Sequence, residues 1–594
     1  HSRKPCASRR RMKRYYIGLA TTFHDPALAI VDAEGEIVFA EAAERFQQNK
    51  RAINAEPDHL FRIADLIKEY CEQDAEFTIA RSWSARASRL PFLAGVASRL
   101  GLLSPGWLLC APLDGWSRTL LMRRYQLYHL MLCVRSAHLK AGANLALVMR
   151  HRFGNRKLRF LNFDHHLTHA AYACYGSPFS EAVCMIVDGT GEQGSISCYA
   201  YRNGRLHRLS RHQGSESLGG LYMLITELCG FSSFGGEEWK VMGLAPYGRT
   251  DEAIYRLLRP MIKVAGCGLR YPPMRQLRAA LRYLWAYRRT ADASALAVAD
   301  LAHTWQRVFS EIMDELLQNL YEETRVDNLV LSGGCALNSS YAGRVFESTP
   351  FKRLHIPSAP ADDGNAVGAA LLAYEKTAGP RKARQQLFSP YLGSRVSAET
   401  LTNVARWSGL RTLRHLPETV HLEAARRLAE GKILGWIQDR AEFGPRALGN
   451  RSILADPRLG EMKDRLNREV KFREEFRPFA PAILHEHGEE YFENYQESPY
   501  MERTLRFRQE VRAKVPAVVH VDGTGRLQTV KREWNARFHA LIEAFHRLTN
   551  VPLLLNTSFN IMGKPMVHTV EDALAVFFTT GMDALVIEDY LLEK

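Results

Sequence analysis

The first residues that could do chemistry are two histidines spaced to grip one metal ion. His165 and His169 lie four residues apart, so on a helix they share one face. Asp188 follows an apolar strand-like run, and Asp362 opens an Asp-Asp-Gly turn. Two imidazoles with carboxylates suit iron, manganese or zinc. The alternative explanation is an exposed helix with chance histidines.

Two glycine-rich turns after apolar runs could hold a nucleotide. Residues 188–192 read Asp-Gly-Thr-Gly-Glu, and residues 332–338 read Ser-Gly-Gly-Cys-Ala-Leu-Asn. Glycines in such turns let backbone N–H groups approach a phosphate. Neither is a P-loop or a dinucleotide fingerprint. A plain hairpin turn in the first case, and tight helix–strand packing in the second, are the structural alternatives.

The densest group of polar residues is basic and lies late in the chain. Residues 440–452 carry arginines between glycine, proline and phenylalanine, and the group continues with Lys471, Arg473, Arg477, Arg526 and the run Asn-Thr-Ser-Phe-Asn at 556–560. Guanidinium forks match phosphate oxygens, and serine, threonine and asparagine add donors. Scattered arginines usually form a solvated face, but the interleaved residue types favour an anion pocket.

Length and composition limit the possible domain number, partners and redox environment of the protein. The 594 residues exceed the size of a single core, and 46% hydrophobic with 24% charged residues is an ordinary globular balance. The net charge of +15 favours anionic partners, with nucleic acid, a membrane surface and phosphorylated substrates all open. Ten cysteines without a Cys-x-x-Cys pair indicate reduced core thiols in a cytoplasmic protein.

Two strand-turn-strand patterns are expected to position the glycine turns. Residues 15–40 read as three strands with a polar and then a tight turn, and the pattern recurs at 182–204. Two such units indicate an actin-like ATPase core, in which two loops face each other across a nucleotide cleft. Residues 68–157, rich in Arg, Leu and Trp, are predicted to be a helical insertion. The apolar run 90–113 contains Arg99, prolines and glycines, so it predicts a packed hairpin or interfacial element and no stable membrane insertion.

A composition shift at 377–395 divides the chain. Beyond it, strands at 433–437 and 551–555 alternate with helices at 423–430 and 531–548, a pattern typical of a second α/β domain. We therefore expect a tag or disordered start at 1–11, an actin-like nucleotide and metal domain at 12–378, and a second α/β domain at 379–594.

Read together, these segments resemble the O-carbamoyltransferase family of nodulation and antibiotic-tailoring enzymes. The matching motifs occur in family order and are Phe23-His24-Asp25, Glu44-Arg45-Phe46, His165-x-x-x-His169, and residues 187–192, 240–248, 332–338, 442–452, 476–481 and 556–560. The resemblance implies an α/β protein with an N-terminal actin-like domain, similar to the tRNA threonylcarbamoyl-modification ATPase, and a YrdC-like carbamoyl-phosphate domain.

The resemblance also implies site residues. The metal, Fe(II) with Mn or Mg as alternatives, would be held by His165, His169, Asp188 and one of two adjacent aspartates, of which we choose Asp362. ATP would contact Gly189, Thr190, Gly191, Lys240, Gly333, Gly334 and Asn338. Carbamoyl phosphate would bind Arg446, Lys471, Arg477, Arg526 and Ser558. His24 would deprotonate the acceptor hydroxyl, and Lys50 would contact carbamoyl or phosphate oxygens.

The implied chemistry has two steps. Carbamoyl phosphate yields carbamate, which attacks the α-phosphate of ATP to give carbamoyladenylate and pyrophosphate. A hydroxyl of a natural product, in antibiotic or toxin biosynthesis, then takes the carbamoyl group and AMP leaves. Aminoglycosides, macrolactams, lipo-oligosaccharides and aromatic polyketide–peptides all remain open as acceptors, as does a homodimeric state.

Some features depart from the family pattern. Arg51 follows Lys50 where the family often has His, and residues 68–157 do not match. Zinc-finger and acylphosphatase-like segments are missing, which disfavours the hydrogenase-maturation branch. The rival hypotheses are a threonylcarbamoyl-type tRNA modifier and a non-catalytic actin-like nucleotide module. A phosphate pocket already accounts for much of the positive charge, so nucleic acid is disfavoured as a partner.

Overall fold

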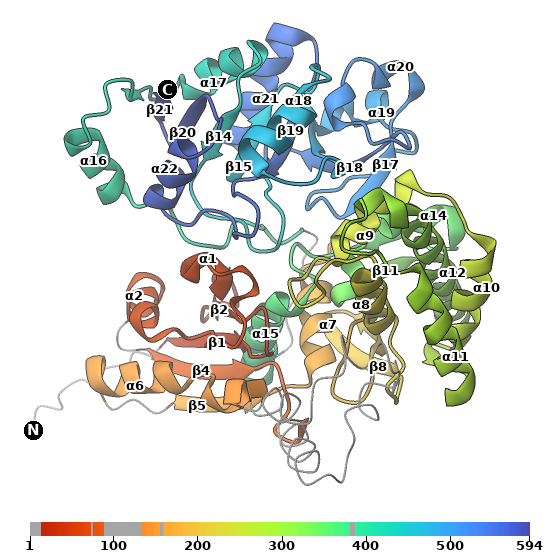
Figure 1. Cartoon of the computed structure of the whole chain (residues 1–594). Coiled ribbons are helices and arrows are strands. Elements are labelled where there is room, and N and C mark those ends of the chain that lie inside the picture. Colours follow the sequence, from red (N-terminus) through yellow and green to blue (C-terminus); the bar gives the residue numbers. More distant parts are fainter. Residues whose placement is uncertain (1–12, 73–74, 88–132, 135, 155–157, 380–385) are drawn as a thin grey trace, which may run out of the picture.

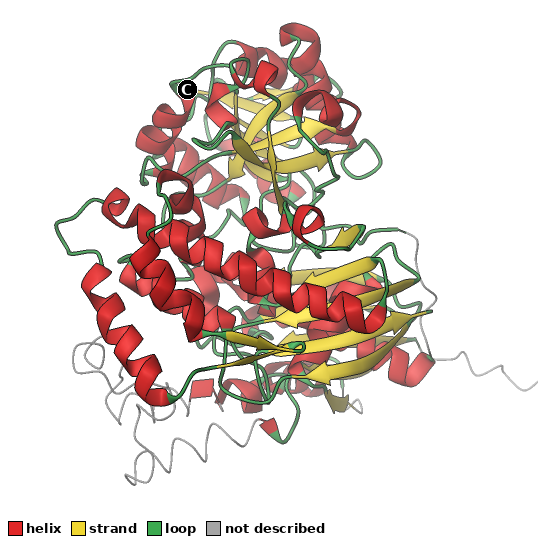
Figure 2. Cartoon of the chain, turned by 90° about the vertical axis from the view of Figure 1, so that its right-hand side faces the viewer, coloured by secondary structure: helices red, strands yellow, loops and turns green. Residues whose placement is uncertain are grey.

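The computed structural model describes residues 13–72, 75–87, 133–134, 136–154, 158–379 and 386–594. Its elements form two tiers in Figure 1, with the last third of the chain above and the earlier elements below. Figure 2 shows helices packed against strands in both tiers. In the described part of the chain, no helix combines the length and apolar character needed to cross a bilayer.

The first sheet has five strands in the order β3-β2-β1-β4-β5. Strands β1 to β3 are antiparallel neighbours, whereas β4 and β5 run parallel to β1. The bounds are β1 (Arg14–Ala20), β2 (Ala27–Val31), β3 (Ile37–Ala42), β4 (Glu76–Arg81) and β5 (Leu158–Asn162). The three-stranded meander predicted for residues 15–40 is confirmed.

The second sheet repeats this topology in the order β8-β7-β6-β11-β12. Again three antiparallel strands are extended by two parallel ones. The bounds are β6 (Glu181–Val187), β7 (Ile196–Arg202), β8 (Arg205–Arg211), β11 (Asn328–Ser332) and β12 (Arg353–His355). The second predicted strand-turn-strand unit is therefore confirmed, and the first turns of the two units occupy equivalent places, as an actin-like core requires.

Strand β4 corrects the prediction that residues 68–157 form a helical insertion. Glu76–Arg81 lies between β1 and β5, and Phe77 and Ile79 are buried. A short, continuously buried strand next to Arg-rich sequence has no period-two pattern and is easily assigned to the flanking helical pattern. Helix α6 (Ala143–Arg152) is helical as predicted. The expected hairpin at 90–113 and the start at 1–11 lie outside the described residues.

Helix α15 (Asn365–Ala378) lies against β1 and against α7 (His165–Tyr175) through two glycines. A Cβ on Gly18 would lie 1.8 Å from a carbonyl oxygen of α15, and a Cβ on Gly368 would lie 1.9 Å from a carbonyl oxygen of α7. Both contacts are therefore backbone against backbone. They hold α15 and α7 at one separation.

The other helices of this tier are α1 (Ala43–Gln47), α2 (Leu60–Tyr70), α8 (Leu218–Leu228), α9 (Glu238–Leu244), α10 (Glu252–Leu258), α11 (Met274–Leu284), α12 (Ala299–Thr324), α13 (Ser339–Ala342) and α14 (Val345–Ser348), with a hairpin of β9 (Lys263–Ala265) and β10 (Gly268–Arg270).

The upper tier contains a nine-stranded sheet in the order β13-β21-β20-β14-β15-β19-β16-β18-β17. Its strands are β13 (Arg414–His415), β14 (Leu434–Ile437), β15 (Arg451–Ala455), β16 (Ala480–Leu484), β17 (Arg503–Arg506), β18 (Thr524–Val530), β19 (Leu553–Ser558), β20 (Ala584–Ile587) and β21 (Tyr590–Glu593). Its helices are α16 (Ala398–Trp407), α17 (Val420–Ala429), α18 (Met462–Leu466), α19 (Gly488–Tyr491), α20 (Gln509–Arg512), α21 (Ala536–Thr549) and α22 (Val570–Phe578).

Two predicted boundaries in this tier shift for identifiable reasons. Strand β19 continues to Ser558 because its pairing with β15 continues to Ser452, so the residues 556–558 lie in the strand and not after it. Helix α21 begins at Ala536, later than predicted, because the Asn535 side chain accepts a hydrogen bond from Phe538 N and caps the helix. The YrdC-like assignment of this tier stays a prediction.

Buried polar contacts join the two tiers. Glu41 of β3 accepts hydrogen bonds from Arg62, from Ser394 N at 3.0 Å and from Ser394 Oγ at 2.7 Å. His568 Nε2 of the upper tier lies 3.4 Å from the same carboxylate. Arg45 Nη2 donates to a carbonyl oxygen of the upper tier at 2.6 Å. Ion pairs and hydrogen bonds of Glu41 and Arg45 therefore fix the position of one tier relative to the other.

Candidate functional site

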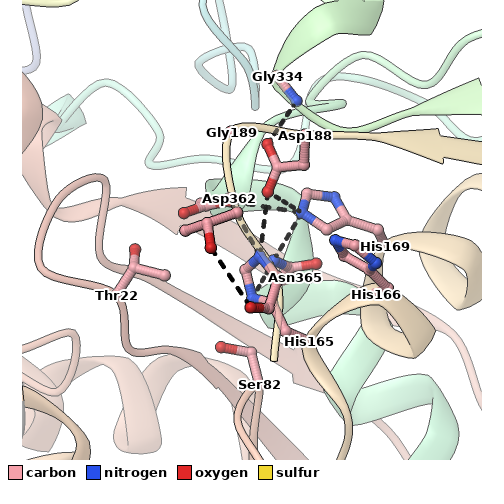
Figure 3. A network of polar contacts seen from close by, with 12 residues as sticks. Thr22, Ser82, His165, His166, His169, Asp188, Gly189, Gly334, Asp362 and Asn365 are labelled. Atoms are coloured by element: carbon pink, nitrogen blue, oxygen red, sulfur yellow. Dashed lines mark hydrogen bonds and ion pairs between the residues drawn. The ribbon is translucent and has the colours of Figure 1, made fainter. Parts of the chain in front are cut away.

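Four predicted metal ligands converge in one buried group (Figure 3). Helix α7 carries two of them and begins at His165, because the preceding Asp164 side chain caps the helix. One donor atom from each residue lies within 4.8 Å of the others, and the group consists of His165, His169, Asp188 and Asp362. Two imidazole nitrogens and two carboxylate oxygens at this spacing fit a borderline divalent ion.

Asp188 is fixed by backbone on one side and faces the histidines on the other. It directly follows β6, and its Oδ1 accepts a hydrogen bond from Gly334 N at 2.9 Å. Its Oδ2 lies 3.3 Å from His165 Nε2 and 3.9 Å from His169 Nε2. The glycine turn at 332–338 therefore orients the carboxylate of Asp188, which opens the glycine turn at 188–192.

Asp362 points at the histidines, whereas its neighbour does not. Asp362 Oδ1 lies 3.4 Å from His165 Nε2 and 3.3 Å from His169 Nε2. Asp363 instead accepts a hydrogen bond from Gly364 N at 3.0 Å, and burial raises its pKa to about 7. Burial alone would lower the pKa of His165, but the two carboxylates raise it to about 10. Opposite charges are therefore matched within the group.

Asn365 belongs to this group and was missed by sequence reasoning. Its Nδ2 lies 3.1 Å from His169 Nε2 and 3.4 Å from His165 Nδ1. Its Oδ1 is buried and has no hydrogen-bond partner among the described residues. Asn365 follows Asp362 by three residues, and this i,i+3 spacing is the signal that could have identified it.

The loop after β4 also reaches the group. The Trp83 ring stacks on His165 with ring centroids 4.3 Å apart. Ser84 donates to Glu192 from its backbone N at 2.7 Å and from its Oγ at 2.6 Å, and Glu192 also accepts from His165 N at 3.3 Å. No sequence signal indicated Trp83, because the contact depends on where β4 lies in the sheet.

His24 stands on the turn after β1, beside the metal-ligand group. Its Nδ1 lies 2.9 Å from Asp25 Oδ2 and 3.9 Å from Asp362 Oδ2, and its side chain is 38% exposed. Burial alone would lower the pKa of His24, but the Asp25 carboxylate raises it above its ordinary value. With Nδ1–H donating to Asp25, the neutral ring presents Nε2 as a proton acceptor.

Four arginines of the upper tier converge with little opposing charge. Burial lowers the pKa of Arg446 to about 10, and no acidic side chain opposes the effect. Burial and the charges of Arg446, Arg473 and Arg477 hold the pKa of Arg526 well below its usual range. N–H groups of Arg473, Arg477 and Arg526 are buried without a hydrogen-bond partner among the described residues. Such a concentration of guanidinium groups fits a bound anion.

Lys471 and Ser558 lie beside these arginines but have different roles. Lys471 Nζ donates to Ser558 O at 2.7 Å and to Asn560 Oδ1 at 2.6 Å. Burial and two neighbouring arginines lower the pKa of Lys471 well below its usual range. Lys471 thus holds the end of β19 at Ser558, which lines the cavity, together with the turn that follows it.

One cavity of about 1580 Å³ joins the two groups. The predicted residues that line it are His24, Lys50, Asp188, Gly189, Thr190, Gly191, Gly334, Asn338, Asp362, Arg446, Arg477, Arg526 and Ser558. His165, His169, Lys240, Gly333 and Lys471 are not part of the lining, so the metal-ligand group borders the cavity through Asp188 and Asp362. Lys240 pairs with Glu237 at 2.7 Å and Glu474 at 2.8 Å, and Gly333, with φ 91°, packs against β6.

The first glycine turn is backed by the start of α8. Ser217 caps this helix and its Oγ donates to Gly189 O at 2.7 Å. Gly219 packs closely behind the turn, since a Cβ there would lie 3.0 Å from Gly189 Cα. The positive end of a helix dipole thus lies behind backbone that faces the cavity, an arrangement that favours a phosphate.

The amino-acid sequence of this chain matches known protein families and relatives. Family models described as "Carbamoyltransferase N-terminus" and "Carbamoyltransferase C-terminus" match residues 115–371 and 425–594. Nodulation protein NolNO of Sinorhizobium fredii is 36% identical over 78% of this chain and 69% of its own length. Nodulation protein NolO of Bradyrhizobium diazoefficiens is 36% identical over 73% and 79%. The 3'-hydroxymethylcephem-O-carbamoyltransferase of Amycolatopsis lactamdurans is 28% identical over 76% and 84%. A solved structure of full-length HypF in the phosphate- and nucleotide-bound form aligns over 62% of this chain and 57% of its own, with 11% identity and a TM-score of 0.35.

Proposed function

This chain belongs to the O-carbamoyltransferase family, and on that premise we propose that it is an ATP-dependent O-carbamoyltransferase that acts through carbamoyladenylate. The acceptor is a hydroxyl of a small-molecule secondary metabolite. The observation that carries the proposal is the shared cavity. An arginine group suited to carbamoyl phosphate lines it, and the His/Asp group suited to a divalent metal borders the same space through Asp188 and Asp362.

The metal-ligand group fits a resident divalent ion. Imidazole nitrogens, carboxylate oxygens and the unpartnered Asn365 Oδ1 offer the donor types that iron or manganese accepts. His165, His169, Asp188 and Asp362 would hold it. When bound, such an ion offsets negative charge on the ATP phosphates.

The first half-reaction begins at the arginine group. Arg446, Arg477 and Arg526 bind the phosphoryl oxygens of carbamoyl phosphate, and attack by water releases phosphate and carbamate. A carbamate oxygen then attacks the α-phosphorus of ATP, and pyrophosphate leaves with the bonding electrons. The turn Gly189–Gly191 and Asn338 position the nucleotide. Carbamate decomposes in water, so its formation inside one cavity protects it from bulk solvent.

The second half-reaction takes place at His24. The acceptor oxygen attacks the carbamoyl carbon of the adenylate, the bond from that carbon to the AMP oxygen breaks, and AMP leaves. His24 Nε2 takes the hydroxyl proton while Nδ1–H stays bonded to Asp25 Oδ2. Lys50 lines the same cavity as His24 and Arg477 and would contact the carbamoyl or phosphate oxygens during transfer.

Adenylation without an acceptor tests the proposal. Purified protein, ATP, Fe(II) and carbamoyl phosphate are expected to give pyrophosphate and carbamoyladenylate, detected by mass spectrometry. Neither product is expected without carbamoyl phosphate, or from His165→Ala and Arg477→Ala. Pyrophosphate that forms equally well without carbamoyl phosphate would refute the mechanism.

A further inference from the structure

We propose that the cavity wall beside His24, formed by Ile53 and the segment 233–236, receives the apolar, aromatic or alicyclic face of the acceptor. The inference rests on the proposed function and adds to it the chemical class of the acceptor. Phe234 and Ile53 both line the cavity, with 48% and 38% of their surfaces exposed. Large apolar side chains left this open inside a cavity mark a surface that a ligand covers.

Arg51 ties this wall to the His24 turn. Its Nη2 donates to Asp25 Oδ2 at 3.0 Å, the oxygen that also lies 2.9 Å from His24 Nδ1. Its Nη1 donates to the carbonyl oxygens of Ser233 at 3.2 Å and Phe234 at 3.1 Å. One guanidinium therefore fixes the apolar wall relative to the proposed base.

The backbone around this clamp is held in unusual conformations. Asp25 has φ 53° and Arg51 has φ 62°, which residues with side chains seldom adopt. Asp25 N donates to Arg51 O at 2.9 Å, so the two residues hold each other. At Gly236, φ is 67° and an added Cβ would lie 3.0 Å from Arg51 Cδ. Such conformations persist where the surroundings enforce them, as at ligand sites.

Several hydrogen-bonding groups of this wall already have partners within the protein. Ser233 Oγ donates to Glu227 Oε1 at 2.6 Å, and the Arg51 guanidinium is committed to Asp25 and two carbonyls. A sugar that turned its hydroxyl groups toward the Phe234 ring and the Ile53 side chain would lose hydration without gaining hydrogen-bond partners. An aromatic face would lose little and would gain burial. The acceptor is therefore a hydroxyl on an apolar ring skeleton.

The same segment continues to the arginine group. Arg477 Cζ lies 4.0 Å from the Trp239 ring, and the next residue, Lys240, pairs with Glu474. Residues 233–240 thus extend from the His24 turn to the site proposed for carbamoyl phosphate. The wall proposed for the acceptor is therefore continuous in the chain with the residue that contacts the arginine group.

Two alcohols test the acceptor class. The wild-type protein receives ATP, Fe(II), carbamoyl phosphate and either 2-phenylethanol or methyl α-glucoside at equal concentration, and the carbamate ester is measured by mass spectrometry. We expect 2-phenylethanol to react at least about tenfold faster. A faster reaction with the glucoside would overturn the inference. Pyrophosphate measured without alcohol reports separately on the proposed function.

Matched variants locate the binding surface. Phe234→Ser should raise KM for 2-phenylethanol about tenfold, whereas Phe578→Ser, which removes a phenylalanine of 52% exposure outside the cavity lining, should not. Ligand-observed NMR gives the same comparison as Kd, without catalysis. If Kd is equal in the wild type and Phe234→Ser, the apolar wall is refuted whether or not pyrophosphate forms.

Discussion

The metal-ligand group and the arginine group, which border the same cavity, differ in charge balance: the first combines opposite charges, and the second brings like charges together. In the metal-ligand group, one donor atom of each residue lies within 4.8 Å of the others, and the two carboxylates stabilise the protonated form of His165. In the arginine group, Arg526 is surrounded by three further guanidiniums and like charges face each other. The first group can hold its shape with its own members, whereas the second needs an anion to complete it. Charge balance thus distinguishes the proposed cation site from the proposed anion site.

The largest effect is expected from the metal-ligand group. Asp188→Asn keeps the bond from Gly334 N to Oδ1 but removes the charge that faces the histidines. We expect pyrophosphate formation to fall about 1000-fold and Fe(II) or Mn(II) affinity to fall with it. Calorimetric metal titration and a pyrophosphate assay measure the two losses. Unchanged metal affinity would show that the four residues form an ion-pair cluster only.

The arginine group should respond next most strongly. Arg526→Gln removes one of the charges held together by burial, and we expect Kd for inorganic phosphate to rise about 100-fold. Arg508→Gln, an exposed arginine bonded to a backbone carbonyl, is the matched control and should leave Kd unchanged. Tighter binding in Arg526→Gln would mean that the group is not an anion site.

A third charged cluster sharpens the comparison because it is fully paired. Arg62→Ala leaves Glu41 buried with fewer partners, and we expect a loss of about 3 kcal/mol in denaturant unfolding. Arg202→Ala breaks an exposed ion pair with Glu181 and should cost less than about 1 kcal/mol. Equal losses in the free energy of unfolding would mean that burial does not determine how much these ion pairs stabilise the fold.

The same cluster predicts the effect of acid. Burial alone would raise the pKa of Glu41, but Arg62 and His568 hold it well below 4.5. A carboxyl whose pKa is lower in the folded chain contributes stability above the unfolded value, and that stability is lost as the pH falls below about 4.5. Unfolding followed between pH 6 and pH 3 should therefore show a weaker pH dependence in Glu41→Gln than in the wild type.

The smallest effect concerns the acid that borders the arginine group. Partial burial would raise the pKa of Glu474, but the hydrogen bond from Lys240 lowers it to about 2, so Glu474 stays charged beside Arg477 at 3.1 Å. Glu474→Gln should tighten phosphate binding by roughly threefold. Glu475→Gln changes an exposed neighbour and serves as control. Weaker binding would show that Glu474 positions Arg477 more than it competes with the anion.

Local patterns explain what the sequence could predict. Each strand-turn-strand unit is specified by adjacent residues, and the i,i+4 spacing of His165 and His169 needs only a helix to bring the rings together. Two adjacent aspartates could be ranked only weakly, because the choice depends on the exit angle of a turn. That angle places Asp362 near the histidines and leaves Asp363 on a backbone N–H.

Contacts between segments that are far apart in the chain explain which features could not be predicted from the sequence. Lys240 and Lys471 were identified from their motifs, but their ammonium groups are bonded to Glu474 and Asn560, which lie about 230 and 90 residues away in the chain. Trp83 reaches His165 only because β4 completes a sheet. Residue types indicate which groups can bind a ligand, whereas packing decides which are already occupied.

The backbone contact at Gly368 bears on the proposed metal ion, because it fixes the spacing of the segments that would hold that ion. Helix α7 carries both histidines, and Asp362 directly precedes α15, whose Gly368 leaves space for less than one methyl group against α7. Neither helix can approach the other, and the interdigitated core resists their separation. The distance between the ligand-bearing segments is therefore set by the main chain. A metal ion held by these residues, as proposed, would therefore be selected by its ionic radius, because the distance between the two segments cannot adjust to a larger or smaller ion.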